Sequence, residues 1–356
     1  MPTNQMVLSQ ILSVVRLEMA KTFFSKRGLW VYLLALAPVL IYAGHSLVEI
    51  RGAEENRAWA AAQPVKAEFL QSIQPGLSLD QVVQRAGEPF RQSTSVRRNF
   101  TMRNYQYTDG EEQYTFVIVN DKVTNVVRRK RDSLAADLLI FATVFQFFYL
   151  RLAIFFGCVG VFTNLFRGEL LDKSLHYYLL TPIRREVLAI GKYIAGLTAT
   201  IVIFTTSTAL QLVAMSWHID RTELANYLNG PGWSHVLAYL GVTVAACVGY
   251  GGVFLAAGLL FKNPIIPAAA VQVWESANMF LPAILKKFSI IFYLQSLCPV
   301  VAPPDADMNP ILKLLINSAE PVRVPVAILG LAAVTCVVLW FAAVQARRLE
   351  INYSSE

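Results

Sequence analysis

Charge is the scarcest property of this sequence. Only 15% of its 356 residues are Asp, Glu, Lys or Arg, against about 25% in a typical soluble domain. Apolar residues make up 55%, and the mean hydropathy is +0.46. Although the net charge is +7, the basic residues collect beside apolar stretches, where membrane topology accounts for them. The composition excludes soluble enzymes, nucleic-acid-binding proteins and fibrous proteins, and it indicates a protein embedded in lipid.

The sequence has few cysteines and none of the common catalytic motifs. Cys158, Cys247 and Cys336 fall in apolar stretches, and Cys298 has no partner outside them, so no disulfide framework is expected. There is no Gly-x-x-x-x-Gly-Lys-Ser/Thr phosphate loop, no His-Glu-x-x-His zinc motif and no Gly-x-Ser-x-Gly nucleophile motif. The four histidines are scattered near the ends of apolar stretches: His45, His176, His218 and His235. We therefore expect no catalytic residue, no metal and no cofactor in this chain, and no enzyme activity of its own.

Six apolar stretches are long enough to cross a membrane as helices, since about 20 residues span the hydrocarbon core. They are residues 28–48, 134–162, 193–217, 236–261, 265–285 and 324–346. The first has 21 residues, too many for the roughly 7–15-residue core of a cleaved signal peptide, so we expect it to remain as an anchor. The sequence predicts an α-helical membrane protein with six transmembrane helices.

The positions of Lys and Arg predict the orientation. Basic residues are concentrated in residues 1–27, in the loop 163–192 and in the tail 347–356, and the short loops on the other side carry fewer. By the positive-inside rule both termini should be cytoplasmic. The cluster Arg128 to Arg131 lies on the predicted outer side, but loops beyond about 60 residues translocate largely regardless of their charge.

Residues 49–133 have a polar composition and should form a separate water-facing α+β domain. A helix is expected over 53–73 with an interruption at Pro64, and a second over 79–86 with Ser78 as N-cap and Gly87 as C-cap. Three strands should follow, over residues 104–108, 113–120 and 122–128, joined by turns at Asp109-Gly110 and Asn120-Asp121. The predicted order is two helices and then three antiparallel strands (ααβββ).

The run from Gly76 to Pro89, followed by Tyr105-Gln106-Tyr107 and by the segment 114–124, resembles the SmpA/OmlA (BamE-like) domain of bacterial envelope proteins. The resemblance covers about 55 residues and implies binding of an envelope protein rather than chemistry. The alternative is a small two-layer domain in which the Gly and Pro residues only shape turns.

The loop between the second and third stretches carries the most informative motif. Leu171, Leu175, Tyr178 and Leu179 share one face of a predicted short helix, Pro182 ends it, and basic residues mark the bilayer surface. This predicts an amphipathic helix beneath the membrane.

The same loop resembles that of ABC-2 type permeases, the membrane subunits of ATP-binding-cassette transporters. In their pattern Glu-x-x-x-Gly-Thr-Leu-x-x-Leu-Leu-x-x-Pro-x-x-Arg, followed by a Lys, the corresponding places are occupied here by Glu169, Leu175, Leu179, Pro182, Arg185 and Lys192, and Lys173-Ser174 replaces Gly-Thr. The resemblance extends to Arg16-Leu17-Glu18 and to the six-span plan, and it implies the ABC-2 (type V exporter-like) fold. It assigns contact with the ATPase to one coupling segment: Glu169, Leu171, Lys173, Ser174, Leu175, Leu179, Pro182, Arg184 and Arg185. The alternative is a generic interfacial helix with snorkelling arginines.

The resemblance also implies the partners and the location. An exporter of this type lies in the bacterial inner membrane, in contact with its lipids, and pairs two permease subunits, here most simply two copies of this chain. ATP and Mg²⁺ would be bound by a separate ATPase subunit. The outer loop 286–323 is rich in proline and should contain short re-entrant helices, as in the resembled family.

Two charges fall deep inside apolar stretches, Arg151 and Glu275. A charge in hydrocarbon costs at least about 2.5 kcal/mol, so both should face protein or a water-filled cavity. Two roles are open for them, lining a substrate pathway or forming an intramembrane ion pair. A rival function from another class is an envelope sensor or assembly factor whose outer domain binds a partner, but an anchor would need neither these charges nor a coupling motif.

Overall fold

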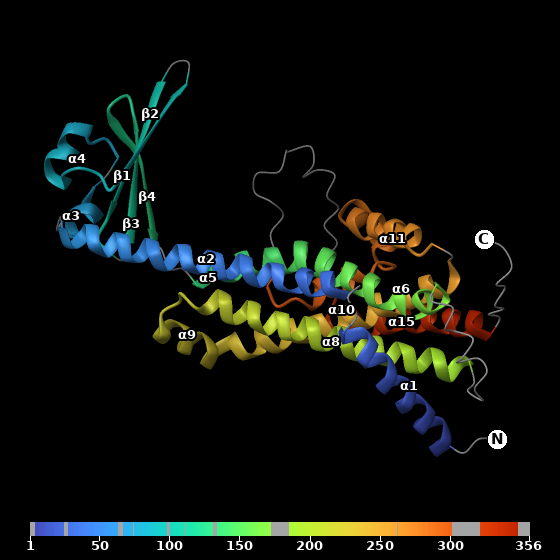
Figure 1. Cartoon of the computed structure of the whole chain (residues 1–356). Coiled ribbons are helices and arrows are strands. Elements are labelled where there is room, and N and C mark those ends of the chain that lie inside the picture. The colour runs from blue at the N-terminus through green and yellow to red at the C-terminus, as the bar shows by residue number, and fades with distance from the viewer. Residues whose placement is uncertain are drawn as a thin grey trace. The chain divides into compact units, whose positions relative to one another are not determined.

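The computed structural model describes most of the chain in two compact units. Described are residues 4–24, 28–62, 67–73, 75–97, 100–110, 112–130, 134–171, 185–261, 263–300 and 321–347. The first unit comprises residues up to Tyr42, Leu138–Ala214 and the chain from Leu224 onward, and the second comprises Ala43–Asp137 and Met215–Glu223. Figure 1 shows the elements of both units.

The first unit is helical. Its main helices are α1 (Asn4–Phe24), the first half of α2 (Leu29–Ala62), α5 (Leu134–Val144), the π-helix η2 (Phe145–Ile154), α6 (Phe155–Leu171), α8 (Arg185–Ser216), α10 (Trp233–Leu260) and α15 (Val324–Arg347). Short helices complete it: the end of α9 (Arg221–Tyr227), η3 (Leu228–Gly232), α11 (Ile265–Ala277), η4 (Asn278–Phe280), α12 (Ala283–Lys286) and α13 (Ile290–Leu297).

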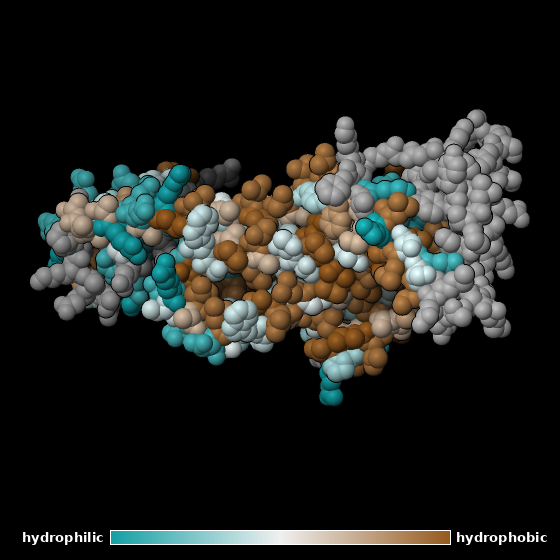
Figure 2. All heavy atoms as spheres, turned by 60° about the horizontal axis from the view of Figure 1, so that its bottom comes forward, coloured by the Kyte–Doolittle hydropathy of each residue, from teal (hydrophilic) through white to brown (hydrophobic). Residues whose placement is uncertain are grey.

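Within the described residues, five helical segments are long and apolar enough to span a membrane. They are Leu29–Ala62, Leu134–Leu165, Val187–Ser216, Arg221–Leu260 and Val324–Val344. Many of their large apolar side chains point outward: Leu33, Leu40 and Leu329 are each about 70% exposed, and apolar side chains cover much of the visible surface of these helices (Figure 2). An apolar surface of this extent is suited to contact with lipid. The chain is therefore a multi-pass helical membrane protein.

The sixth expected span, residues 265–285, is not a single helix. α11 ends at Ala277 after 13 residues, about 20 Å of helix against a core of about 30 Å. The chain continues with a 3₁₀ turn and an extended residue at Leu281. The next residue, Pro282, has no N–H and therefore cannot continue the helix. The chain then forms α12 and α13. In place of the six predicted spans, the described part of the chain thus has five long apolar helices and a broken segment of short helices.

Helix α10 lies at the centre of the first unit and packs against α6 and α15. A Cβ built on Gly258 would lie 3.1 Å from the Cα of Thr163, so α6 approaches too closely for any larger side chain. Gly249 and Gly252, two small residues that permit close helix approach, instead face α13 and α15. Tyr149, Phe155, Tyr250 and other buried aromatic rings fill the remaining space.

The second unit contains a four-stranded antiparallel sheet in the order β1-β2-β3-β4. The strands are β1 (Arg91–Arg97), β2 (Phe100–Thr108), β3 (Glu112–Val119) and β4 (Lys122–Lys130). Helices α3 (Ala67–Ser72) and α4 (Leu79–Ala86) lie on one side of it (Figure 1). Their core is formed by Leu70, Ile73, Val82, Ala86, Tyr107, Tyr114, Phe116, Ile118 and Val123.

The local predictions for this unit are confirmed. Ser78 and Gln81 form a reciprocal capping box at the start of α4, and Gly87 ends the helix with φ +73°. Asn120 and Asp121 both have positive φ, as a tight hairpin turn requires.

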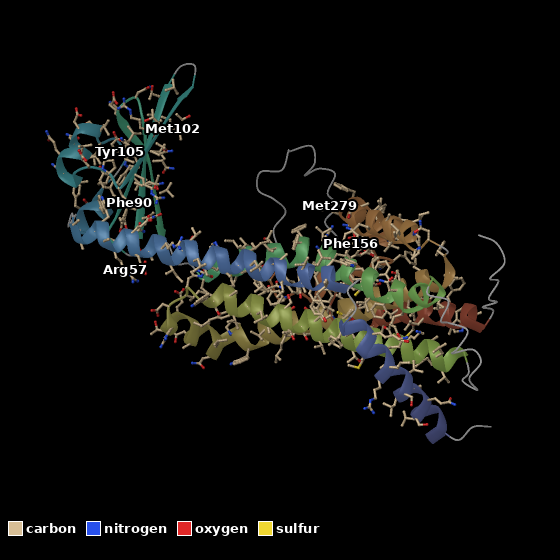
Figure 3. The ribbon with its side chains drawn as sticks, in the orientation of Figure 1. Arg57, Phe90, Met102, Tyr105, Phe156 and Met279 are labelled. Atoms are coloured by element: carbon tan, nitrogen blue, oxygen red, sulfur yellow. The ribbon has the colours of Figure 1, made fainter. Side chains whose placement is uncertain are left out.

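Two expectations for this unit need correction. The sheet has four strands rather than three, because the polar segment Arg91–Arg97 pairs along β2 from Arg91–Gln106 to Arg97–Phe100. The helix of the first apolar stretch also does not end with that stretch at residue 48, since α2 continues without a break to Ala62. Its far half carries Trp59, which packs on Phe90 and Tyr107, whereas Arg57 points away from the sheet (Figure 3).

The Tyr107 hydroxyl offers a test of this core. It donates a hydrogen bond of 2.9 Å to the carbonyl of Gly87, and burial raises the pKa of the phenol, which therefore stays protonated. Tyr107→Phe should lower the free energy of unfolding of this unit by about 1 kcal/mol. The matched control is Tyr105→Phe, which should have almost no effect because the Tyr105 hydroxyl has no hydrogen bond among the described residues. Amide hydrogen exchange of β2 and β3 in the full chain measures both, and equal effects would contradict the assignment.

Candidate functional site

Most of the predicted coupling segment lies outside the described residues. Lys173, Ser174, Leu175, Leu179, Pro182 and Arg184 belong to this group. Glu169 and Leu171 are in the last turn of α6, and Arg185 is the first residue of α8. The structure therefore places the two helices that flank the segment.

A buried ion pair joins α8, one of the two helices that flank this segment, to α1. The Lys192 Nζ, on α8, donates to the Glu18 Oε1 of α1 at 2.9 Å and to the carbonyl oxygen of Leu165 on α6 at 2.8 Å. The Lys192 side chain is fully buried and that of Glu18 is 4% exposed. Three helices thus meet at one ammonium group. Sequence reasoning had noted Glu18 and Lys192 only as separate parts of the family resemblance, because nothing local indicates that they touch.

Arg151 and Glu275 are both buried in the first unit, 8% and 3% exposed. No ion pair joins them among the described residues, although each lies near enough to influence the other electrostatically. Tyr250, fully buried on α10, is an electrostatic neighbour of both. These three residues form one cluster of buried polar side chains in the helical bundle.

The two charges of this cluster are held differently. The Glu275 carboxylate accepts hydrogen bonds from the Ser289 hydroxyl at 2.9 Å, the Ile290 amide at 3.0 Å and the Ile291 amide at 2.8 Å. It therefore caps the first turn of α13. Arg151 lies in the π-helix η2, its guanidinium carbon is 5.4 Å from the centre of the Phe147 ring, and its Nε is buried without a hydrogen-bond partner. Glu275 is thus a structural cap, whereas Arg151 keeps unused hydrogen-bonding capacity.

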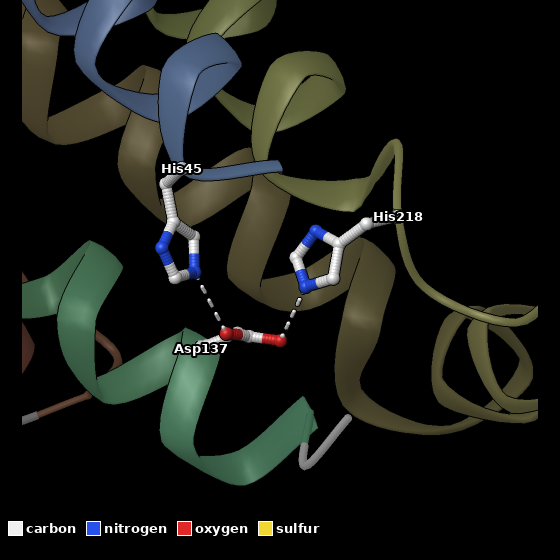
Figure 4. A group of neighbouring side chains, drawn as sticks. All are labelled: His45, Asp137 and His218. Atoms are coloured by element: carbon white, nitrogen blue, oxygen red, sulfur yellow. Dashed lines mark hydrogen bonds and ion pairs between the residues drawn. The ribbon is translucent and has the colours of Figure 1, made fainter. Parts of the chain in front are cut away.

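A third group of polar side chains lies in the second unit, at the ends of apolar segments. His45 is on α2, Asp137 is in the first turn of α5, and His218 is in the turn between α8 and α9 (Figure 4). The Nε2 of His45 is 3.4 Å from Asp137 Oδ1, and the Nε2 of His218 is 3.0 Å from Asp137 Oδ2. The other ring nitrogen of His218, Nδ1, is 3.0 Å from the Ser46 hydroxyl oxygen. This His-Asp-His cluster is the one group among the described residues whose donor atoms could hold a metal ion.

Sequence reasoning missed this cluster by treating the histidines as scattered. A signal was present: His45 and Asp137 stand at the two boundaries of the segment 49–133, and His218 immediately follows the third apolar stretch. On the predicted topology all three lie at the same membrane surface, which is a necessary condition for them to meet.

Comparisons with known proteins add no identification. The chain matches no protein-family model, no curated protein and no solved structure.

Proposed function

We propose that this chain is the membrane-spanning permease subunit of an ATP-driven ABC-2 type exporter. The multi-pass helical bundle and the coupling-segment resemblance support this proposal. A separate ATPase subunit would bind ATP and Mg²⁺ and would drive the outward movement of a substrate through two paired copies of the permease.

The observation that carries the proposal is the buried Arg151 with its unpartnered Nε. A charge inside a membrane bundle is costly and usually serves a substrate or ion pathway. Unsatisfied buried donors are rare and call for a ligand or water to complete them. π-helical segments such as η2 are also frequent at functional sites. A protein that was only anchored by its helices would need none of these features.

The coupling role assigns energy input to the segment between α6 and α8. Lys192, the last position of the family pattern, connects α8 to α1 and α6 through its contacts with Glu18 and Leu165. A push on the coupling segment would therefore reach three helices at once. This connection gives the motif a mechanical path into the bundle.

The first test disrupts the proposed ATPase contact. Glu169→Ala combined with Leu175→Arg should abolish co-purification of the co-expressed ATPase and stimulation of ATP hydrolysis, because an arginine cannot enter an apolar groove without losing its hydration. Val96→Arg is the control, since Val96 is 76% exposed on β1, far from the motif in sequence, and its variant should bind normally. Unchanged binding by the double variant would refute the coupling assignment.

The second test concerns orientation. On this proposal the segment 49–133 is outside the cytoplasm and both termini are inside. In a background in which the exposed Cys336 is replaced by serine, the other three cysteines are buried. Asp109→Cys, placed in the β2–β3 turn, should then react with an impermeant maleimide added to intact cells stripped of their outer membrane. If the cysteine reacted only in inverted vesicles, the segment 49–133 would face the cytoplasm and the proposed orientation would be wrong.

The alternative is an envelope sensor or assembly protein whose outer domain binds another envelope protein. One observation favours it: α2 runs as a single helix from the first apolar segment into the polar one, a route by which binding could be transmitted. The co-purification experiment distinguishes the exporter from the sensor. A sensor would not co-purify with an ATPase, and Leu175→Arg would not impair its sensing or assembly activity.

A further inference from the structure

We propose that His45, Asp137 and His218 bind a divalent transition-metal ion, with Zn²⁺ as the ion that fits best. The sequence alone led us to expect no metal in this chain. The proposal rests on the geometry of the second unit and is independent of any transport function. Three donor atoms, one from each residue, lie within 4.8 Å of one another.

The spacing of the donor atoms suits a shared ion. Two ligand atoms each about 2.1 Å from a tetrahedral ion lie about 3.4 Å apart. The two histidine Nε2 atoms are 3.4 and 3.0 Å from the two oxygens of the Asp137 carboxylate. The longer separation exceeds the usual 2.7–3.2 Å of an N–H···O hydrogen bond. Small side-chain movements would therefore place all three groups around one cation.

The chemistry of the donors selects the class of ion. Imidazole is a ligand of Zn²⁺ and of neighbouring transition metals, whereas Ca²⁺ and Mg²⁺ prefer all-oxygen sites. Two imidazoles and one carboxylate, with solvent in the fourth position, form a familiar zinc ligand set. The Asp137 side chain is 9% exposed, and its only side-chain partners among the described residues are these two histidines. A divalent ion would place two positive charges beside this buried carboxyl group.

A supporting residue lies behind one ligand. Metal-binding histidines usually hydrogen-bond through their other ring nitrogen, which fixes the ring and leaves a lone pair toward the ion. The Ser46 hydroxyl lies 3.0 Å from His218 Nδ1 and is fully buried. With Nδ1–H donating to Ser46, His218 would present Nε2 to the metal. The 26% exposure of the His45 side chain leaves a route for the ion to enter.

The ion would cross-link three segments of the second unit. Its ligands come from α2, from the start of α5 and from the turn after α8, segments separated by 92 and 81 residues along the chain. Binding to the folded state alone raises stability with ion concentration. We therefore infer that Zn²⁺ fastens these three segments of the second unit to one another.

The experiment uses the full chain, purified in detergent with an affinity tag that contains no histidine. After loading with Zn²⁺ and removal of excess, metal analysis should give one ion per chain, and the melting temperature should rise with Zn²⁺ but not with Mg²⁺. Co²⁺ in the same site should give the strong visible absorption of a four-coordinate ion. His218→Gln and Asp137→Asn should each weaken Zn²⁺ binding by about 100-fold or more, since even loss of a supporting residue costs about 10–100-fold.

Two further variants keep the test decisive if a ligand variant fails to fold. Ser46→Ala leaves all three ligands in place and should weaken binding by about 10-fold or more. His235→Gln is the matched control, because His235 pairs with the Tyr227 hydroxyl at 2.8 Å and is not part of the cluster. It should bind Zn²⁺ like the wild type. A wild-type chain that retains no Zn²⁺, or a His235→Gln variant that loses as much affinity as His218→Gln, would overturn the proposal.

Discussion

Glu18→Ala should lower the free energy of unfolding by about 3–5 kcal/mol, the cost of breaking a buried ion pair by removing one of its two partners. The Lys192 ammonium would lose its hydrogen bond to Glu18 and keep the one to the Leu165 carbonyl. The loss would also free α1 from α6 and α8, so the N-terminal helix should become accessible to protease. Thermal melting in detergent and limited proteolysis of the full chain measure the two effects.

The double variant Glu18→Leu with Lys192→Met is the critical companion. It removes both charges and retains apolar volume, so it should be less destabilised than either single change, because neither charge is left alone. Lys21→Ala is the control: Lys21 is half-exposed and lies 3.8 Å from Glu18, so its loss should cost at most about 1 kcal/mol. Additive effects of the two single variants would show that the pair is not coupled.

Glu275→Ala should be the second strongly destabilising change, by about 3 kcal/mol, because it strands two backbone amides and one hydroxyl in an apolar environment. The affected element is α13, which has only eight residues and depends on this carboxylate for its first turn. Glu275→Gln should cost roughly half as much, since the amide keeps one acceptor oxygen and loses the charge. Chemical denaturation or thermal melting of the purified protein provides the measurement.

The neighbouring residue supplies the control for this prediction. Ser276 is exposed on the same helix, and Ser276→Ala should change the free energy of unfolding by less than about 0.5 kcal/mol.

Arg151→Gln provides a contrast to Glu275→Ala. On the proposed pathway role it should reduce substrate-stimulated ATP hydrolysis and leave the melting temperature almost unchanged. If Arg151→Gln destabilised the fold as strongly as Glu275→Ala, Arg151 would be a structural residue and the proposed pathway would lose its main support.

Features that depend on composition and on neighbouring residues could be predicted from the amino-acid sequence. The low charge and the long apolar stretches indicated a helical membrane protein, because about 20 apolar residues suffice to span lipid whatever their surroundings. Ser78, Gly87 and the Asn120-Asp121 turn were predictable for a similar reason. A helix cap and a hairpin turn are set by backbone geometry within a few residues.

Features that depend on partners distant in the sequence could not be predicted and were visible only in the folded structure. Apart from Val96, strand β1 is polar and carries no periodic apolar signal, so only its pairing with β2 makes it a strand. The stretch 265–285 is apolar enough to span a membrane, but the turn at Asn278, the break at Pro282 and the bonds from Glu275 to α13 fold it into short helices.

The candidate site residues show the same division. Arg151 and Glu275 could be singled out from the sequence because a charge in an apolar stretch is anomalous on its own. Their separate roles could not be predicted. The sequence does not show that the Glu275 carboxylate caps α13, or that the Arg151 Nε has no hydrogen-bond partner among the described residues. Glu18 meets Lys192 across 174 residues, and His45 meets Asp137 across 92. Such contacts are fixed by helix packing, which brings together side chains whose local sequence gives no sign of the partner.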